Sequence, residues 1–413
     1  MKFIYVALCA LLLIRIVIRK RFDFLSIAAL SFIGYTSSCL VGRVWISRAG
    51  GYYYNEALGT QTYLIIFAQM VLILIALCFR LENGILNEDD FGVRDRPVGY
   101  RLQRRKNSKF WNWLLIACAA IFLYNIVFRI GLSVFFSAMR KSKIMEQVDS
   151  LFSFGIWGAI ICFLYGMLQR KPIHIMGGGM MIMMMFIMGS RAYVATAAAG
   201  AMVVVFTRHR TSLRNKIRIG LIGLVLVLAL LLYKSVYRDV RALDFRAVAA
   251  TLVNPDTYLD MLDIDEFRIN ASLYNYVLEK DFRFPVMDSA ARVLSIIPVV
   301  NDFIPTKYPI RFSSYLMNTA FQSTYGLAGN FWAESYAMGG YAFILFMTGV
   351  WLYLVKRSGE YVRRNRESAA FPVTIASYCC FYLHRLDWVQ ALGCVKSVLI
   401  IGVLFLCYRK VTV

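Results

Sequence analysis

Three arginines stand beside long apolar runs, where they are candidates for chemistry on a charged substrate. Arg191 follows Gly189-Ser190 at a tight turn between two apolar segments, and Arg238 and Arg241 follow the end of another. A guanidinium group donates two parallel hydrogen bonds to a phosphate, so these positions suit a diphosphate and are candidate catalytic residues. Side chains three apart share a helix face, which predicts that Arg238 and Arg241 hold one anion together. The alternative is that Arg241 pairs with Asp244 and that Arg191 reaches lipid phosphate.

Glu334 is the acidic candidate for a catalytic role. It lies in the stretch GNFWAESYAMGGY, residues 329–341, at the mouth of the apolar run AFILFMTGVWLYLV. A carboxylate near a helix N-terminus is stabilised by about 0.3–1 kcal/mol, so capping alone would explain it. Burial beside Trp332 and Tyr336 would suit a general base, whereas a nearby Arg191 would make Glu334 an orienting partner for that guanidinium. The sequence leaves these roles open, and we expect a functional one.

The composition places the residues in a membrane. Hydrophobic residues make up 59% of the chain and charged residues 17%, and the mean hydropathy is +0.59, so too little polar surface remains to cover a soluble core. The nine cysteines lie mostly inside apolar runs, with no disulfide or metal-ligand spacing. A P-loop, a dinucleotide fingerprint and an HExxH motif are also absent from the sequence, so we expect no cofactor and no metal.

Long apolar segments predict the elements that hold these residues. Runs of about 17–25 apolar residues mark helices that cross a bilayer, and about eleven such runs predict an all-α polytopic membrane protein. The first run lacks a small-residue cleavage site and is interpreted as a retained span. The predicted spans are residues 2–18, 23–46, 61–79, 111–132, 151–169, 173–188, 191–207, 217–236, 333–355, 369–384 and 391–408.

The distribution of lysine and arginine orients the spans. Lysine and arginine collect in short cytoplasmic loops, and every strongly basic short loop lies on that side when the N-terminus is outside and the C-terminus is cytoplasmic. This topology explains most of the +22 net charge without nucleic acid. It divides the chain into eight spans (1–236), one large outer loop (237–331) and three spans (332–413). Residues 288–304 are apolar but too short to cross, which predicts an interfacial or re-entrant helix.

Aromatic and basic residues on the outer side are candidates for binding a sugar and its diphosphate. Aromatic faces stack on sugar CH groups, and arginines bind phosphate oxygens; the alternative is that many of these rings form an interfacial belt or the core of the loop. The substrate-binding candidates are Arg268, Arg283, Arg292, Arg311, Trp332, Tyr336, His384 and Arg385.

Two stretches carry a family resemblance. The turn and span GSRAYVATAAAGAMVVV and the stretch GNFWAESYAMGGY, with the large outer loop before the latter, resemble bacterial oligosaccharide repeat-unit polymerases, the Wzy-type or O-antigen polymerases. The resemblance implies a glycosyltransferase of the bacterial inner membrane that builds O-antigen, capsule or exopolysaccharide. Undecaprenyl-diphosphate-linked oligosaccharides would be donor and acceptor, and a chain-length regulator is a further partner that the resemblance leaves open. Arg191 and Glu334 match the arginine and carboxylate of the family pattern.

Two other functions stay open at this point. O-antigen ligases share the architecture and use a histidine on the outer side, where His384 is the one candidate in this sequence. A lipid-linked oligosaccharide transporter predicts charged residues along mid-span cavities and short loops on both sides, which fits this sequence less well.

Overall fold

The computed structural model describes residues 1–19, 22–48, 51–79, 98–207, 212–262, 265–297, 303–321, 329–364 and 367–412. This part of the chain is mainly helical and contains one antiparallel hairpin of β1 (Arg43–Arg48) and β2 (Gly51–Ala57). The helices are α1 (Lys2–Ile18), α2 (Phe24–Tyr35), α3 (Ser38–Val41), α4 (Thr60–Cys78), α5 (Val98–Tyr124), η2 (Asn125–Ile130), α6 (Leu132–Phe135), α7 (Lys141–Met145), α8 (Leu151–Gln169), α9 (Pro172–Ile187), α10 (Arg191–Thr207), α11 (Leu213–Arg241), α12 (Phe245–Val253), α13 (Pro255–Leu262), α14 (Asp265–Glu279), α15 (Val286–Leu294), α16 (Phe312–Thr319), α17 (Phe331–Arg364), η4 (Glu367–Ala369), α18 (Ala370–Tyr382), η5 (Leu383–Arg385) and α19 (Trp388–Thr412).

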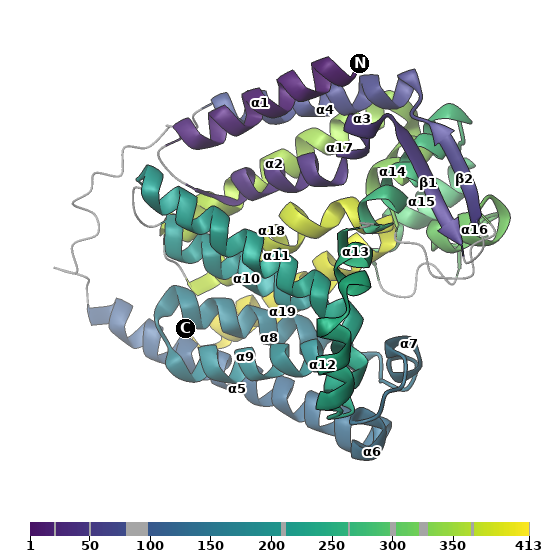
Figure 1. Cartoon of the computed structure of the whole chain (residues 1–413). Helices are drawn as coiled ribbons and strands as arrows, with labels where there is room; N and C mark the ends of the chain where they lie inside the picture. Colours follow the sequence, from purple (N-terminus) through teal and green to yellow (C-terminus); the bar gives the residue numbers. More distant parts are fainter. Residues whose placement is uncertain are drawn as a thin grey trace.

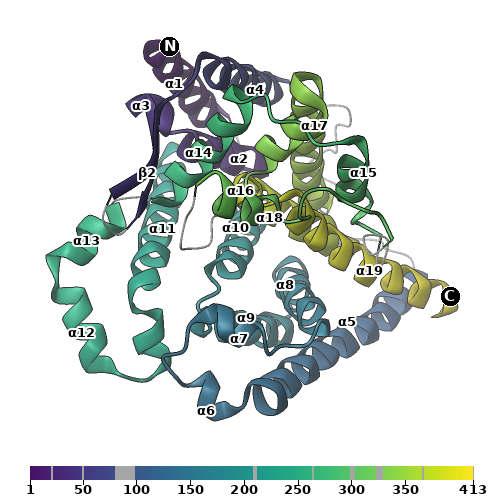
Figure 2. The same ribbon diagram turned by 90° about the vertical axis from the view of Figure 1, so that its right-hand side faces the viewer.

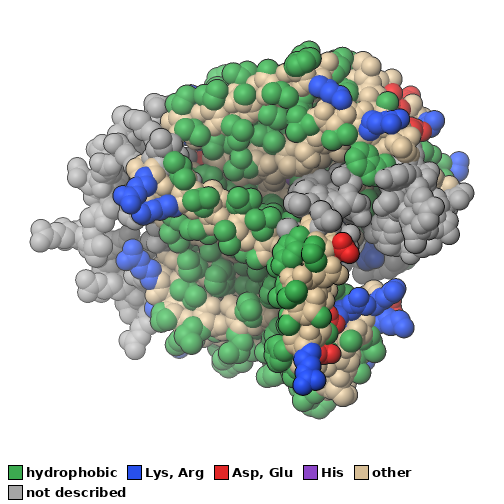
Figure 3. Space-filling model, viewed as in Figure 1, with side chains coloured by type: hydrophobic (Ala, Val, Ile, Leu, Met, Phe, Trp, Pro, Cys, Tyr) green, Lys and Arg blue, Asp and Glu red, His purple; other side chains and the backbone are tan. Residues whose placement is uncertain are grey.

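The helices identify a multi-pass membrane protein. Six helices among the described residues are long and apolar enough to cross a membrane. Hydrophobic side chains cover the middle of the molecule in Figure 3, and most visible charged side chains lie toward its two ends. The six are Thr60–Cys78, Ser108–Ile130, Leu151–Gln169, Ile217–Arg241, Phe331–Val362 and Trp388–Val411; the shorter apolar helices are Phe24–Tyr35, Pro172–Ile187 and Arg191–Phe206.

Each predicted span contains a helix, but the span predicted over 23–46 is wrong in its second half. The helix α2 ends at Tyr35, and the chain continues through a turn and α3 into strand β1. Gly42 ends α3 in the left-handed region, with φ of 76°, and the following residues are β-branched and aromatic. Residues 23–46 form one apolar run in the sequence because a short apolar helix is followed closely by an apolar strand. Hydropathy does not distinguish the two elements, so it predicted a single span.

The elements between the spans gather at one end of the molecule. The long helices run side by side across the view of Figure 1, and the β1–β2 hairpin, α6, α7 and α12–α16 lie toward its right-hand side. Figure 2 looks onto this end, where α15 lies near α17 and α19. Within this region α14 packs against β1, α4 and α17. The large predicted loop is therefore helical and partly built into the bundle.

The short helix α15 buries its charged residues and exposes its apolar ones, the opposite of a helix on a water-soluble protein. Its inner face buries Asp288 and Arg292, while Val286 and Met287 on the outer face are 83% and 52% exposed. An apolar face turned away from the protein is typical of a helix that lies against lipid. The helix predicted within 288–304 is present up to Leu294, and residues 298–302 lie outside the described part of the chain.

The Gly339-Gly340 pair breaks α17 near its N-terminal end. Gly340 has φ of 68° and ψ of −157°, a backbone conformation that glycine adopts and residues with a side chain rarely do. A Cβ at Gly340 would also lie 2.5 Å from Nη1 of Arg283. The break turns the segment that carries Glu334 relative to the membrane-spanning part of α17.

We predict that Gly340→Ala lowers the free energy of unfolding by about 1–3 kcal/mol, because the new side chain strains the backbone and displaces Arg283. The measurement is equilibrium unfolding of the purified protein in detergent. Gly349→Ala is the matched control: the position lies in the same helix, and a Cβ added there would meet no heavy atom within 4 Å, so this change should be neutral or slightly stabilising. Equal effects of the two changes would contradict the strain at Gly340.

Candidate functional site

Glu334 does not cap its own helix. The N-terminus of α17 is capped by Asn330, whose Oδ1 accepts hydrogen bonds from the Trp332 and Ala333 N–H groups, both at 3.0 Å. The carboxylate of Glu334 instead reaches the start of α19, where its Oε2 accepts a hydrogen bond of 2.9 Å from the Trp388 N–H. Glu334 is only 1% exposed, so this bond is made away from water. The residue caps a neighbouring helix and joins α17 to α19.

Arg292 lies beside this carboxylate and is buried completely. Its Nε is 4.0 Å from Oε2 of Glu334. Its Nη1 and Nη2 donate to the backbone carbonyls of Asp288 and Pro309 at 3.0 and 2.8 Å, and its guanidinium stacks on Phe284 at 3.8 Å. Arg292 is therefore committed to holding the loop after α15 against α17.

A second acid, Asp387, completes this cluster. It lies between η5 and α19 and is 1% exposed, and its Oδ2 accepts a hydrogen bond of 2.7 Å from Oγ of Ser313. Burial raises the pKa of the Asp387 carboxyl, although Ser313 lowers it in part. We call Asp288, Arg292, Glu334 and Asp387 the buried charge cluster.

His384 belongs to an adjoining buried hydrogen-bond chain. Its Nδ1 accepts a hydrogen bond of 2.9 Å from Nε1 of Trp332, so Nδ1 carries no proton. Its Nε2 lies 3.2 Å from Oγ of Ser31, whose hydroxyl lies 2.6 Å from the Cys380 carbonyl. The hydroxyl donates to the carbonyl, and the imidazole therefore donates from Nε2 in its neutral form. Both ring nitrogens are in use, and neither is open to a substrate.

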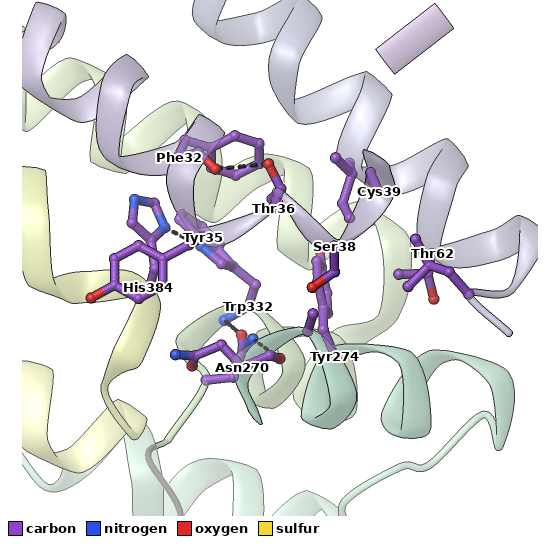
Figure 4. A pocket seen from close by; sticks show the side chains of 14 residues that line it. Phe32, Tyr35, Thr36, Ser38, Cys39, Thr62, Asn270, Tyr274, Trp332 and His384 are labelled. Atoms are coloured by element: carbon purple, nitrogen blue, oxygen red, sulfur yellow. Dashed lines mark hydrogen bonds between the residues drawn. The ribbon is translucent and has the colours of Figure 1, made fainter. Parts of the chain in front are cut away.

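A small cavity lies beside His384 and Trp332 (Figure 4). Its volume is about 20 Å³, and Asn270, Thr36 and Thr62 contribute polar groups to its wall. This space holds a single water molecule and is far too small for a sugar ring. A ligand as large as a sugar therefore does not fit in this cavity.

A second group of charged residues is more open. Arg191 begins α10, is half-buried, and donates from Nη1 to the Leu230 carbonyl at 3.0 Å. Burial and the nearby charges of Arg191 and Arg385 lower the pKa of Lys141 from 10.5 to about 8. Lys141, Arg191 and Arg385 come from three segments far apart in the sequence, and we call them the basic group.

Aromatic residues connect the elements that carry Arg191 and Arg385. The rings of Tyr193 and Trp157 are 5.5 Å apart, those of Trp157 and Tyr378 4.9 Å, and those of Tyr378 and Tyr382 5.6 Å. The guanidinium of Arg385 lies over the Tyr382 ring at 6.0 Å. This packing fixes the start of α10 relative to η5, and with them Arg191 and Arg385.

The structure does not support the predicted pairing of Arg238 with Arg241. Arg238 is exposed, whereas Arg241 is fully buried. Arg241 donates from Nε to the Ser137 carbonyl at 2.7 Å and from Nη2 to the Met139 carbonyl. The two side chains share helical spacing, but the segment before α7 covers one of them. The role of Arg241 is to hold that segment on the end of α11.

The remaining predicted residues lie in other places. Nη1 of Arg283 donates to the Tyr336 carbonyl at 2.9 Å, and its guanidinium stacks on the Tyr336 ring at 4.0 Å. The hydroxyl of Tyr336 donates to Oδ1 of Asp281 at 2.7 Å, and this bond, with Arg283, holds the pKa of Asp281 below its usual range. Arg311 is exposed and its charge acts on the Asp387 carboxyl. The side chain of Arg268 lies outside the described residues.

Sequence reasoning missed Asp387 and Lys141. Asp387 is the one acid between the predicted spans 369–384 and 391–408, and Lys141 lies with two other basic residues between the predicted spans 111–132 and 151–169. The predicted topology assigns both segments to the outer side. Basic residues in an outer loop depart from the positive-inside pattern, and that departure was the available signal for Lys141. Among the described residues no group of three or more His, Cys, Asp or Glu side chains could hold a metal ion.

We predict that Arg241→Ala lowers the free energy of unfolding by about 1.5–3 kcal/mol, because hydrogen bonds from a buried charged donor are lost. Arg238→Ala, three residues away on the same helix end, should change it by no more than about 0.5 kcal/mol. Equilibrium unfolding in detergent measures both. The assignment of Arg241 as a structural residue is wrong if the two variants are equally stable.

Comparison of the chain with protein-family models, with curated proteins and with solved structures finds no match. The function is therefore argued from the residues and their geometry.

Proposed function

We propose that the chain is a membrane glycosyltransferase that polymerises undecaprenyl-diphosphate-linked oligosaccharide repeat units into O-antigen, capsule or exopolysaccharide. The observation that supports this most is the basic group, in which the charges of Arg191 and Arg385 act on the ammonium group of Lys141 although like charges repel one another. A half-buried set of three cations is stabilised by a multiply charged anion. A lipid diphosphate carries that charge and is anchored at the level of the membrane surface.

In the proposed reaction a hydroxyl oxygen at the end of one lipid-linked repeat attacks the anomeric carbon of the growing chain. The new glycosidic bond forms as the bond between that carbon and the diphosphate oxygen breaks, and the diphosphate leaves with the electron pair. The proton of the attacking hydroxyl passes to water at the membrane surface. Guanidinium and ammonium groups fixed beside the diphosphate stabilise the charge that develops on it, and this is the contribution expected of the basic group.

Glu334 has a positioning role in this proposal. Its carboxylate is buried and bonded to the Trp388 N–H, so it does not face the surface where a sugar would bind. It sets the start of α19, and the segment before α19 carries Arg385. Of the roles that the sequence left open, positioning fits these contacts best.

The competing ligase function depends on His384. Both ring nitrogens of His384 are hydrogen-bonded inside the protein, to Trp332 and to Ser31. A general base needs a free nitrogen within reach of the substrate hydroxyl. This geometry favours the polymerase over the ligase.

The proposal includes the complete topology. We infer about eleven spans, in which α1 and the short helices α2, α9, α10 and α18 join the six long ones, in the bacterial inner membrane. The N-terminus and the end with α12–α16 are outside, and the C-terminus is cytoplasmic.

Cysteine labelling tests this topology in a background in which the nine cysteines are replaced. We predict that a membrane-impermeant thiol reagent labels Lys280→Cys in intact cells and labels Ser212→Cys only after permeabilisation. Both residues are exposed, so a difference between them reports the side of the membrane. Labelling of position 212 in intact cells would reverse the orientation.

Incubation with a synthetic undecaprenyl-diphosphate oligosaccharide tests the function. The expected product is a ladder of polymers, whereas transfer of one chain to a second lipid would indicate a ligase, and no covalent product would indicate transport. We predict that Arg191→Ala and Arg385→Ala each slow polymerisation by about 10²–10³-fold. Arg191→Lys should be nearly as slow as Arg191→Ala, because the forked donor is lost.

Arg246→Ala is the control, since Arg246 is exposed on the neighbouring helix α12 and should be dispensable. Lys141 gives a second readout: with a pKa of about 8 it loses its proton as the pH rises through that value, and substrate binding should weaken there. Lys141→Arg keeps the charge and should remove this dependence. Normal polymerisation by both Arg191→Ala and Arg385→Ala would end the diphosphate role.

A further inference from the structure

The buried charge cluster contains more acid than base. Asp288, Glu334 and Asp387 are each 1% exposed, and Arg292, at 0%, is the cation among them. Burying an uncompensated charge costs several kcal/mol, so the carboxyl groups cannot all be ionised without a cation for each.

Asp288 has hydrogen-bond donors of its own and lies close to Arg292. The carboxylate of Asp288 accepts hydrogen bonds from the Lys307 and Tyr308 N–H groups at 3.1 and 2.8 Å, and its Oδ1 lies 3.8 Å from Nη1 of Arg292. The Asp288 carboxylate thus has two backbone donors and a nearby cation. The Nε of Arg292 has no hydrogen-bond partner among the described residues and lies 4.0 Å from Oε2 of Glu334, beyond hydrogen-bond distance, so one guanidinium faces three carboxyl groups.

Glu334 and Asp387 are left with one unpaired oxygen each. Oε2 of Glu334 accepts from the Trp388 N–H and Oδ2 of Asp387 accepts from Ser313. Oε1 of Glu334 and Oδ1 of Asp387 are buried and have no hydrogen-bond partner of their own in the described part of the chain. The two side chains lie within hydrogen-bonding contact of each other. Two ionised carboxylates in contact would repel, and a proton on either one turns the contact into a hydrogen bond.

We propose that Glu334 and Asp387 together bind one proton, held between Oε1 of Glu334 and Oδ1 of Asp387. The proton-binding site joins the start of α17 to the segment before α19. The remaining negative charge of the pair lies at the N-terminus of α19, where the backbone N–H groups and the helix dipole stabilise it.

Among the described residues around the pair, no other group donates a hydrogen bond to Oε1 of Glu334 or Oδ1 of Asp387. The charged groups facing the pair are Arg292 and Asp288 from α15 and Arg311 at the start of α16, and the neutral His384 lies one hydrogen bond beyond Trp332. Two carboxylate oxygens are far fewer than the six to eight oxygen ligands that Ca²⁺ takes. A proton needs only these two atoms.

The shared proton makes the free energy of unfolding depend on pH, and the direction of this dependence can be derived. In the unfolded chain both carboxyls ionise near their ordinary pKa values, about 3.9 and 4.3. The folded protein keeps one proton to higher pH, so it binds more protons than the unfolded chain, and its stability falls as the pH rises from about 4 to the pH at which the pair releases the proton. Release leaves two adjacent anions that push α17 and the segment before α19 apart.

Equilibrium unfolding of the full chain in detergent across this pH range tests the site. In Glu334→Gln the amide replaces the protonated carboxyl and donates to Oδ1 of Asp387, so one proton no longer enters the unfolding equilibrium. Relative to this variant, the unfolding equilibrium constant of the wild type should rise tenfold per pH unit within the window. Asp387→Asn should behave in the same way and serves if Glu334→Gln does not fold.

Glu360→Gln is the matched control, because Glu360 lies on the same helix in a surface ion pair with Arg357 at 2.7 Å. It should keep the pH dependence of the wild type. Infrared spectra give an independent readout: the wild type should show a protonated carboxyl band that both amide variants lack. The proposal is overturned if this band is missing, if both amide variants keep the wild-type pH dependence, or if added Ca²⁺ or Na⁺ stabilises only the wild type. These measurements do not involve polymerisation and are independent of the proposed function.

Discussion

The hydrogen bond from the Trp388 N–H to Glu334 is the contact on which the end of the molecule that carries α14–α16 depends. It joins the first turns of two long helices, and the carboxylate that accepts it also faces Arg292 and Asp387. The backbone of residue 329 lies against that of residue 387 at this point, since a Cβ at Gly329 would clash with the Asp387 nitrogen. Helix α15, the start of α17 and the start of α19 therefore have to be formed together.

The charged residues form two sets that differ in burial: the buried charge cluster is excluded from water, and the basic group is partly exposed. In the buried charge cluster the hydrogen bonds of Arg292 are directed at backbone carbonyls, and low dielectric makes an unpaired group costly. The basic group is only half-buried, so its charges act on one another while remaining within reach of a ligand. Arg292 is completely buried, whereas the side chain of Arg191 is partly exposed.

The length of the apolar segments predicted most of the long helices, because a helix that crosses the hydrocarbon core of a membrane must be apolar over a fixed distance. The error at residues 23–46 arose where a short helix and an apolar strand adjoin, since hydropathy does not distinguish them. The importance of Glu334 was visible in its position beside an apolar run and two glycines. Its partner Asp387 was not, because a single acid in a short loop carries no pattern until the fold brings it to Glu334. The candidate arginines show the same limit: helical spacing placed Arg238 and Arg241 on adjacent turns, but which of them is covered depends on a segment about a hundred residues away in the chain.

The large loop between α11 and α17 shares its polar groups with the bundle. Tyr274 donates to Gln69 on α4 at 2.9 Å, Asn275 accepts from the Gly59 N–H at 2.8 Å, and the acids that face Arg292 lie on α15 itself and beyond the loop. Meanwhile the outer face of α15 is apolar. As a separate fragment, the loop would have unpaired polar groups in its interior and an exposed hydrophobic surface. It is therefore not an independent domain, and it cannot be transferred to another protein without the helices that it contacts.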